Sequence, residues 1–202
     1  MTTTDSKLSH RMADAFKHVS SELLGESDRG AVILAFAWMD EGLTRALKKF
    51  FLPSTHRSEK GDELFGVGRP LGDAATKIDV AYRLGLIRES TYKSLHIIRR
   101  LRNDFAHLSS KLSFETDNVR DRVNTLFDLQ SDMTDAFLEI TKEIPEVGQL
   151  LQGHAGKPSA RVLPAALGSK ALFALLSGTI VSGLMLLTNE VAPVSHQAAS
   201  TQ

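Results

Sequence analysis

The residues of this chain best suited to chemistry lie in one short stretch, RRLRNDFAH, which runs from Arg99 to His107. A histidine with a pKa near neutrality can remove the proton of a ribose 2′-hydroxyl or protonate a leaving oxygen, and an arginine can stabilise charge on phosphate oxygens. Arg102 and His107 stand five positions apart, with Asn103 directly after the arginine. Neither residue needs a metal for this chemistry. The stretch therefore predicts one candidate catalytic set, Arg102, Asn103 and His107, for metal-independent cleavage of RNA.

The same stretch has a purely structural interpretation. At 3.6 residues per turn, one face of a helix through it is apolar and must be its core side; this face holds Leu95, Ile98, Leu101, Phe105 and Leu108. Arg102 falls at the edge of that face, where an arginine can lay its stem on apolar neighbours while its charged end reaches a carboxylate. A carboxylate from another helix would then fix the packing without any chemistry, and Asp40, Glu41 and Asp73 are the candidates. Both interpretations remain open.

Composition narrows the classes of function. The 202 residues are enough for one domain with a sizeable core and an appendage. Lys and Arg total 24 and Asp and Glu total 24, so the chain lacks the basic excess that drives direct binding to a nucleic-acid backbone. It has no cysteine, which excludes disulfides, thiol nucleophiles and thiolate metal sites. No phosphate loop, dinucleotide fingerprint or metal-ligand spacing is present, so we expect no cofactor and no metal.

Hydrophobic periodicity predicts an all-α fold. Apolar residues recur at spacings of three and four through most of the first 150 positions, and no stretch alternates over a strand's length. We expect a bundle of five or six helices over residues 1–150. Its predicted helices include one capped by Asp28 that carries Ile33 and ends near Phe50, then Leu71–Leu84 closed by Gly85, Thr91–Leu108 capped by Ser90, Asp117–Asp128 and Ser131–Val147. Leu52–Arg69 reads as a connecting loop, and Leu84, Phe137, Leu138 and Ile140 are among the predicted core residues.

The C-terminal part has a different composition. Residues 151–164 are typical of a linker, residues 165–188 of a transmembrane helix and residues 189–202 of a disordered tail. Ala171–Leu187 contains no charge and spans roughly 25 Å as a helix, close to the thickness of a bilayer core. Basic residues precede it and Glu190 follows, so the positive-inside rule predicts a cytoplasmic bundle anchored to the inner membrane. The alternative is a core or oligomerisation helix. The N-terminus has no apolar segment of the kind that a secretory signal requires.

Two family resemblances follow from these residues. Arg102, Asn103 and His107 resemble the motif of HEPN domains, helical bundles that include metal-independent ribonucleases. Glu63–His107 resembles the signature of the bacterial mannitol operon repressor family, and the likeness extends more loosely over about residues 13–147. The matching positions are Pro70, Leu71, Gly72, Lys77, Tyr82, Leu84, Gly85, Leu86, Ile87, Tyr92, Leu95, Arg99, Arg102, Asn103 and His107.

The second resemblance implies a bacterial helical regulator of transcription. The chain contains no helix-turn-helix with a basic recognition helix, so we expect regulation through a protein partner or a homodimer and no direct reading of DNA. The polar positions of the signature predict a partner-binding set of Lys77, Tyr82, Arg99 and Asn103. Under this interpretation the protein is not an enzyme, and RNA is a partner only if Arg102 and His107 are catalytic.

Overall fold

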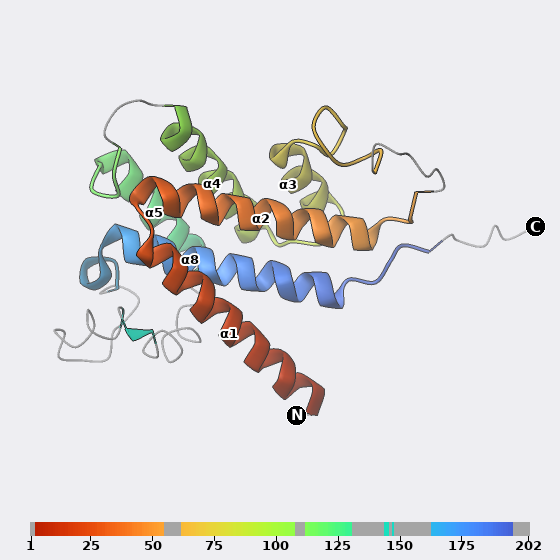
Figure 1. Cartoon of the computed structure of the whole chain (residues 1–202), viewed down its shortest axis with the longest axis horizontal. Helices are drawn as coiled ribbons and strands as arrows, with labels where there is room; N and C mark the ends of the chain where they lie inside the picture. Colours follow the sequence, from red (N-terminus) through yellow and green to blue (C-terminus); the bar gives the residue numbers. More distant parts are fainter. Residues whose placement is uncertain are drawn as a thin grey trace, which may run out of the picture.

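The chain forms an all-α bundle, as the periodicity predicts. The computed structural model describes residues 3–54, 62–107, 112–130, 144–145, 147 and 163–195. Within these ranges there are six helices and no strand: α1 (Thr3–Gly25), α2 (Asp28–Phe50), α3 (Ala74–Arg83), α4 (Glu89–His107), α5 (Asp117–Leu129) and α8 (Leu163–Glu190). Figure 1 shows α2 lying beside α8, with α3 and α4 toward the top of the view and the N-terminal part of α1 diverging from the pair toward the bottom.

The helix ends follow local capping chemistry. The N-cap of α2 is Ser27 and not Asp28, because the Ser27 hydroxyl accepts a hydrogen bond of 3.0 Å from the amide of Gly30. The carboxylate of Asp28 instead accepts the amide of Phe114, at 3.0 Å, and so ties α2 to the segment before α5. α3 begins later than predicted, at Ala74, because the Asp73 side chain caps it. Gly85 closes α3 at φ +71°, as expected for a residue without a Cβ atom.

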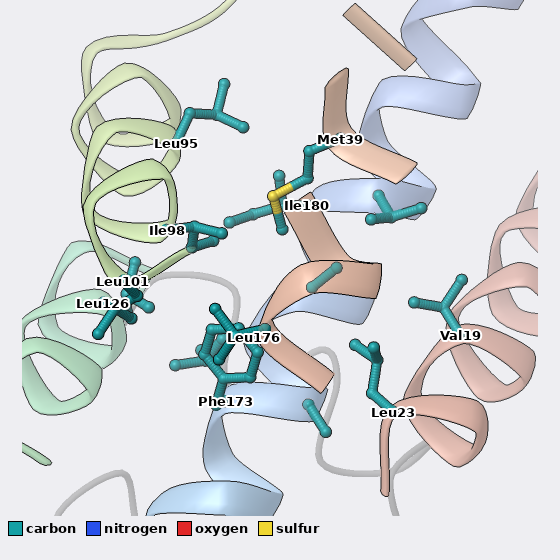
Figure 2. Close-up of a cluster of buried hydrophobic side chains, with 14 of the residues drawn as sticks. Val19, Leu23, Met39, Leu95, Ile98, Leu101, Leu126, Phe173, Leu176 and Ile180 are labelled. Atoms are coloured by element: carbon teal, nitrogen blue, oxygen red, sulfur yellow. The ribbon is translucent and has the colours of Figure 1, made fainter. Parts of the chain in front are cut away.

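The apolar C-terminal helix is the centre of the bundle. α8 packs against α1, α2 and α5, and every residue from Ala171 to Ser182 is buried. Figure 2 shows Phe173, Leu176 and Ile180 of α8 among side chains from the surrounding helices. Those labelled neighbours are Val19 and Leu23 of α1, Met39 of α2, Leu95, Ile98 and Leu101 of α4, and Leu126 of α5. A helix that is apolar on all sides needs such an enclosure, and here amphipathic helices provide it.

Polar contacts hold both ends of α8 on α2. Near its start, the ammonium of Lys170 donates to the carbonyl of Glu26 and lies 3.8 Å from the carboxylate of Asp28. At its end, Lys49 Nζ donates to the last carbonyls of the helix, at 2.9 and 2.8 Å. The amide of Val194 then donates to the carbonyl of Phe50 at 2.8 Å. α2 and α8 therefore run side by side in the same direction, with the helix-end carbonyls satisfied by a lysine.

These contacts bear on the predicted membrane helix. Ala166–Glu190 is long and apolar enough to cross a membrane, with a mean hydropathy of 2.0 in its most apolar part. Of the residues in that part, 72% are buried inside the protein. Length and composition fit both a membrane span and a core helix, whereas the packing favours the core helix. The predicted boundary at residue 150 does not separate α8 from the bundle in space.

Some predicted core positions differ in the structure. Leu84 is a predicted core residue, but it is 39% exposed, so this prediction is wrong; Ile33, on the predicted helix that ends near Phe50, is also 39% exposed. Ile33 lies on the outer side of α2, and Leu84 lies where α3 turns toward α4. Most of the predicted helix Ser131–Val147, with Phe137, Leu138 and Ile140, lies outside the described residues, as do most of the linker and of the tail.

Candidate functional site

The stretch RRLRNDFAH forms the second half of α4. Its predicted apolar face is confirmed, because Leu95, Ile98, Leu101 and Phe105 are each 2% exposed or less. Neighbouring helices cover this face of α4. Figure 2 shows Ile98 and Leu101 directed toward α8 and α5. α4 is therefore fixed in rotation, and its polar residues have defined positions on the outside of the bundle.

Arg102 does not form the predicted ion pair. Its guanidinium carbon lies 5.2 Å from the centroid of the Phe36 ring, and Nη1 donates to Oδ1 of Asn103 at 3.3 Å. A cation over an aromatic face gains stabilisation without a carboxylate. Within the described residues Arg102 has no acidic partner.

The three carboxylates proposed as partners of Arg102 are engaged elsewhere. Asp40 pairs with Lys77 of α3, Glu41 pairs with Arg45 on its own helix, and Asp73 caps α3. Which of these carboxylates pairs with which cation depends on how the helices cross. The spacing of residues along the chain does not give these crossings. The carboxylate next to Asn103, that of Asp104, is bound by Arg122 of α5 at 2.6 Å.

His107 and Arg102 are both on α4 but point in different directions. Five residues at about 100° each place them about 140° apart around the helix axis. His107 is the last residue of α4 and is exposed, whereas Arg102 is half-buried against α2. Within one chain, Arg102 and His107 therefore do not face a common site. Their joint catalytic role stays a prediction.

The predicted partner-binding set divides into buried and accessible residues. Lys77 is only 5% exposed, and its ammonium lies 2.6 Å from the carboxylate of Asp40 and donates to Thr44 at 3.0 Å. It is therefore part of a buried bridge between α3 and α2. Tyr82 is 39% exposed, while Arg99 and Asn103 are half-buried on α4. Nε of Arg99 is buried and has no hydrogen-bond partner among the described residues.

Tyr82 belongs to an aromatic cluster that joins α3 and α4. Its ring lies 4.6 Å from the ring of Tyr92, and Tyr92 in turn contacts His96 edge to face at 4.6 Å. Nε2 of His96 lies 3.2 Å from the carboxylate of Asp79. The hydroxyl of Tyr92 donates to the same carboxylate, and this hydrogen bond, with burial and the negative charge, raises the pKa of Tyr92 above its ordinary value.

Sequence reasoning did not identify this cluster as a unit. It placed Tyr82 in the partner set, but it assigned no role to Asp79. The available signal was spacing: Asp79 and Tyr82 are three apart on one helix, and Tyr92 and His96 are four apart on the next. Tyr92, His96, Arg99 and Asn103 fall on one stripe of α4, so the cluster and two predicted residues share a face.

The surroundings of this cluster are positively charged. From Ala74 to His107 the chain has seven Lys and Arg residues and three Asp and Glu residues, although its total charge is zero. Arg83, Arg88 and Arg100 are exposed, and none of them has a carboxylate partner among the described residues. Arg83 is the last residue of α3 and directly follows Tyr82. We call Tyr82, Arg83, Tyr92 and His96 the aromatic patch. Across the described ranges, no three His, Asp or Glu side chains are grouped so as to hold a metal ion.

Among known proteins, the chain is similar to a solved structure at low sequence identity. No family model matches the chain, and no curated protein matches it. Among solved structures, the chain is similar to MtlR, the mannitol operon repressor, in the X-ray structure of the MtlR–HPr complex from Escherichia coli. This similarity covers 86% of the present chain and 96% of the other, at 19% sequence identity and a TM-score of 0.47.

Proposed function

We propose that the protein is a bacterial transcriptional regulator of the mannitol repressor-like kind, which acts by binding a protein partner through the aromatic patch. The observation that carries this proposal is the stacked pair Tyr82 and Tyr92 beside Arg83, a cation without a carboxylate partner in the described part of the chain. Tyrosine and arginine are the residues most enriched at the centres of protein interfaces. The resemblance of Glu63–His107 to the repressor family covers the same residues.

The charge of the patch indicates the chemistry of its partner. Arg83, Arg88 and Arg100 are exposed and uncompensated, so a surface that presents Asp and Glu side chains would complement them. A nucleic acid would also supply negative charge. It is disfavoured because the chain as a whole is neutral.

The test compares charge reversals at two exposed arginines. Arg83→Glu lies in the patch, and Arg69→Glu, in the loop before α3, makes the same change of net charge outside it. We expect a partner captured from the native bacterium, and then reconstituted with the purified protein, to lose affinity at least tenfold with Arg83→Glu and to keep it with Arg69→Glu. The interaction of the unaltered protein should weaken with added salt. Equal loss with both variants, or with neither, would contradict the proposal.

A second candidate function is cleavage of RNA by Arg102, Asn103 and His107. What favours it is that Arg102 has no carboxylate partner in the described residues and that Nε of Arg99, one turn earlier, is buried without an acceptor. Both guanidinium groups have the N–H donors with which arginine binds a phosphate. Because Arg102 and His107 diverge around α4, the second residue of each site would come from another copy of the chain.

The test of this candidate uses the full chain in chelator with an unstructured RNA. Cleavage lost in both His107→Ala and Arg102→Ala, with helicity retained, would establish a metal-independent ribonuclease. Cleavage restored by mixing the two inactive variants would place the paired residues on different copies. If the unaltered chain does not cleave, this candidate is excluded.

A further inference from the structure

A cavity lies on the side of α8 that faces the connection between α3 and α4. Its volume is about 360 Å³, within the range of small-molecule sites. Leu86 and Ile87 of the connection, Leu129 at the end of α5, and Ile180 and Leu184 of α8 give it apolar walls. Three separate parts of the bundle therefore enclose one space.

A glycine of α8 lies at the edge of this space. Gly183 lines the cavity, and a Cβ atom built on it would meet no atom within 4 Å. Glycine in the interior of a helix costs roughly 0.5–1 kcal/mol relative to alanine. Packing does not require the glycine here, in contrast to Gly178, where the same atom would lie 2.3 Å from the hydroxyl of Ser20.

The mouth of the cavity carries two opposite charges. Arg88 and Glu190 both line it, both are exposed, and neither forms an ion pair within the described residues. Ser90 and Thr91, in the first turn of α4, line it as well. The amino end of a helix favours negative charge, so Arg88 and the start of α4 act in the same direction.

We propose that this cavity binds a small molecule with an apolar body and a carboxylate. The apolar body occupies the space beside Gly183, between Ile180 and Leu184, and the carboxylate binds Arg88 and the first turn of α4. A guanidinium and a carboxylate form the strongest common type of charge-assisted hydrogen bond. Glu190, at the same mouth, would bind an amino group if the ligand carries one.

The position of the cavity connects it to the aromatic patch. Leu86 and Arg88 line the cavity, and Tyr82 and Leu84 lie a few residues earlier on the outer surface. Thr91 lines the cavity, and the next residue, Tyr92, belongs to the patch. A ligand that orders this connection would alter the patch. Only this regulatory consequence rests on the proposed function; the binding site stands without it.

The test measures binding to the purified full chain by calorimetry, with octanoate and leucine as probes. Both have a carboxylate and an apolar chain, and only leucine has an amino group. We expect at least one of them to bind and Gly183→Leu, which fills the cavity, to abolish that binding. Arg88→Gln should weaken it roughly tenfold, the effect of losing one charge-assisted hydrogen bond, while Arg83→Gln outside the cavity should not.

The outcomes separate this proposal from that of partner binding. A preference for leucine that Glu190→Gln removes would identify a ligand with an amino group, and a preference for octanoate would identify a simple carboxylate. Failure of both probes to bind, or binding unchanged in Gly183→Leu, would overturn the proposal. Because no partner protein is present in this experiment, neither result depends on the function of the aromatic patch.

Discussion

At the scale of single residues, the bridge between Lys77 and Asp40 shows how a polar residue expected on the surface can serve the core. Lys77 was predicted as part of a partner surface, and it is instead buried with its ammonium 2.6 Å from a carboxylate of α2. A buried charge requires a partner, because leaving it alone costs far more than the pair gains. The bridge thereby fixes how α3 crosses α2.

This bridge predicts a large effect of removing one partner. Asp40→Ala leaves the buried ammonium of Lys77 without a counter-charge, so we expect the free energy of unfolding to fall by about 3 kcal/mol in urea denaturation. The matched control on the same helix is Glu41→Ala, which breaks the exposed pair with Arg45 and should cost less than about 0.5 kcal/mol. Similar losses in the two variants would refute the assignment of the bridge to the core.

The pKa of Tyr92 gives a second test at this scale. The chain has two tyrosines, so Tyr82→Phe leaves Tyr92 alone for ultraviolet titration. We expect it to ionise above the ordinary value of about 10, and Asp79→Asn to lower the pKa toward that value, because the charged acceptor is gone.

The linked effect on stability has a defined sign. Since the pKa of Tyr92 is higher in the folded state, its contribution is complete below the ordinary tyrosine value and disappears as the pH rises through the raised one. The unfolding free energy of the Asp79→Asn variant should therefore depend less on pH in this alkaline range. An unchanged titration in Asp79→Asn would mean that the hydrogen bond is absent in solution.

At the scale of elements, local sequence signals predicted where helices end and which face is buried, but they did not predict what surrounds each helix. The end of α3 at Gly85 follows from a terminating glycine, and the buried face of α4 follows from periodicity; both are properties of neighbouring residues. The place of α8 does not, because an uncharged helix is compatible with lipid and with a protein core. The partners of Arg102 and Lys77 were not predictable for the same reason: they depend on how α2 crosses its neighbours.

Alanine substitutions at two glycines of α8 are predicted to change the stability of the protein in opposite directions. Gly178 lies against α1, where an added Cβ atom would meet Ser20, whereas Gly183 faces open space. We expect Gly178→Ala to lower the melting temperature, at a cost of about 1–3 kcal/mol from overpacking. Gly183→Ala should raise it slightly, since alanine favours the helix by up to about 1 kcal/mol. Equal responses would show that α1 and α8 are not in contact.

At the scale of the whole molecule, the account requires α8 inside the bundle. A large buried apolar side chain contributes about 1.5–3 kcal/mol, so Leu172, Phe173, Leu176, Ile180 and Leu184 together approach the total stability of a domain, about 5–15 kcal/mol. A chain that ends at residue 153 should therefore fail to unfold cooperatively. The full chain should be released from membranes by alkaline carbonate.

The competing proposal, an inner-membrane anchor through Ala171–Leu187, makes the opposite predictions. A cooperatively folded fragment 1–153 together with a carbonate-resistant full chain would place α8 in the membrane. The hydrogen bonds at the two ends of α8 argue against a membrane anchor. Lys170 of α8 and Lys49 of α2 would each lose their acceptors if α8 moved out of the bundle.

The central claim, that the aromatic patch binds an acidic protein, has one most direct measurement. A photo-reactive phenylalanine derivative in place of Tyr82, which is 39% exposed, would be activated in the protein's native cells and its cross-links mapped by mass spectrometry. The account predicts cross-links to one protein at positions among Asp and Glu residues, lost when Arg83→Glu is added. Cross-links to nucleic acid, or scattered over many proteins and unaffected by Arg83→Glu, would contradict it.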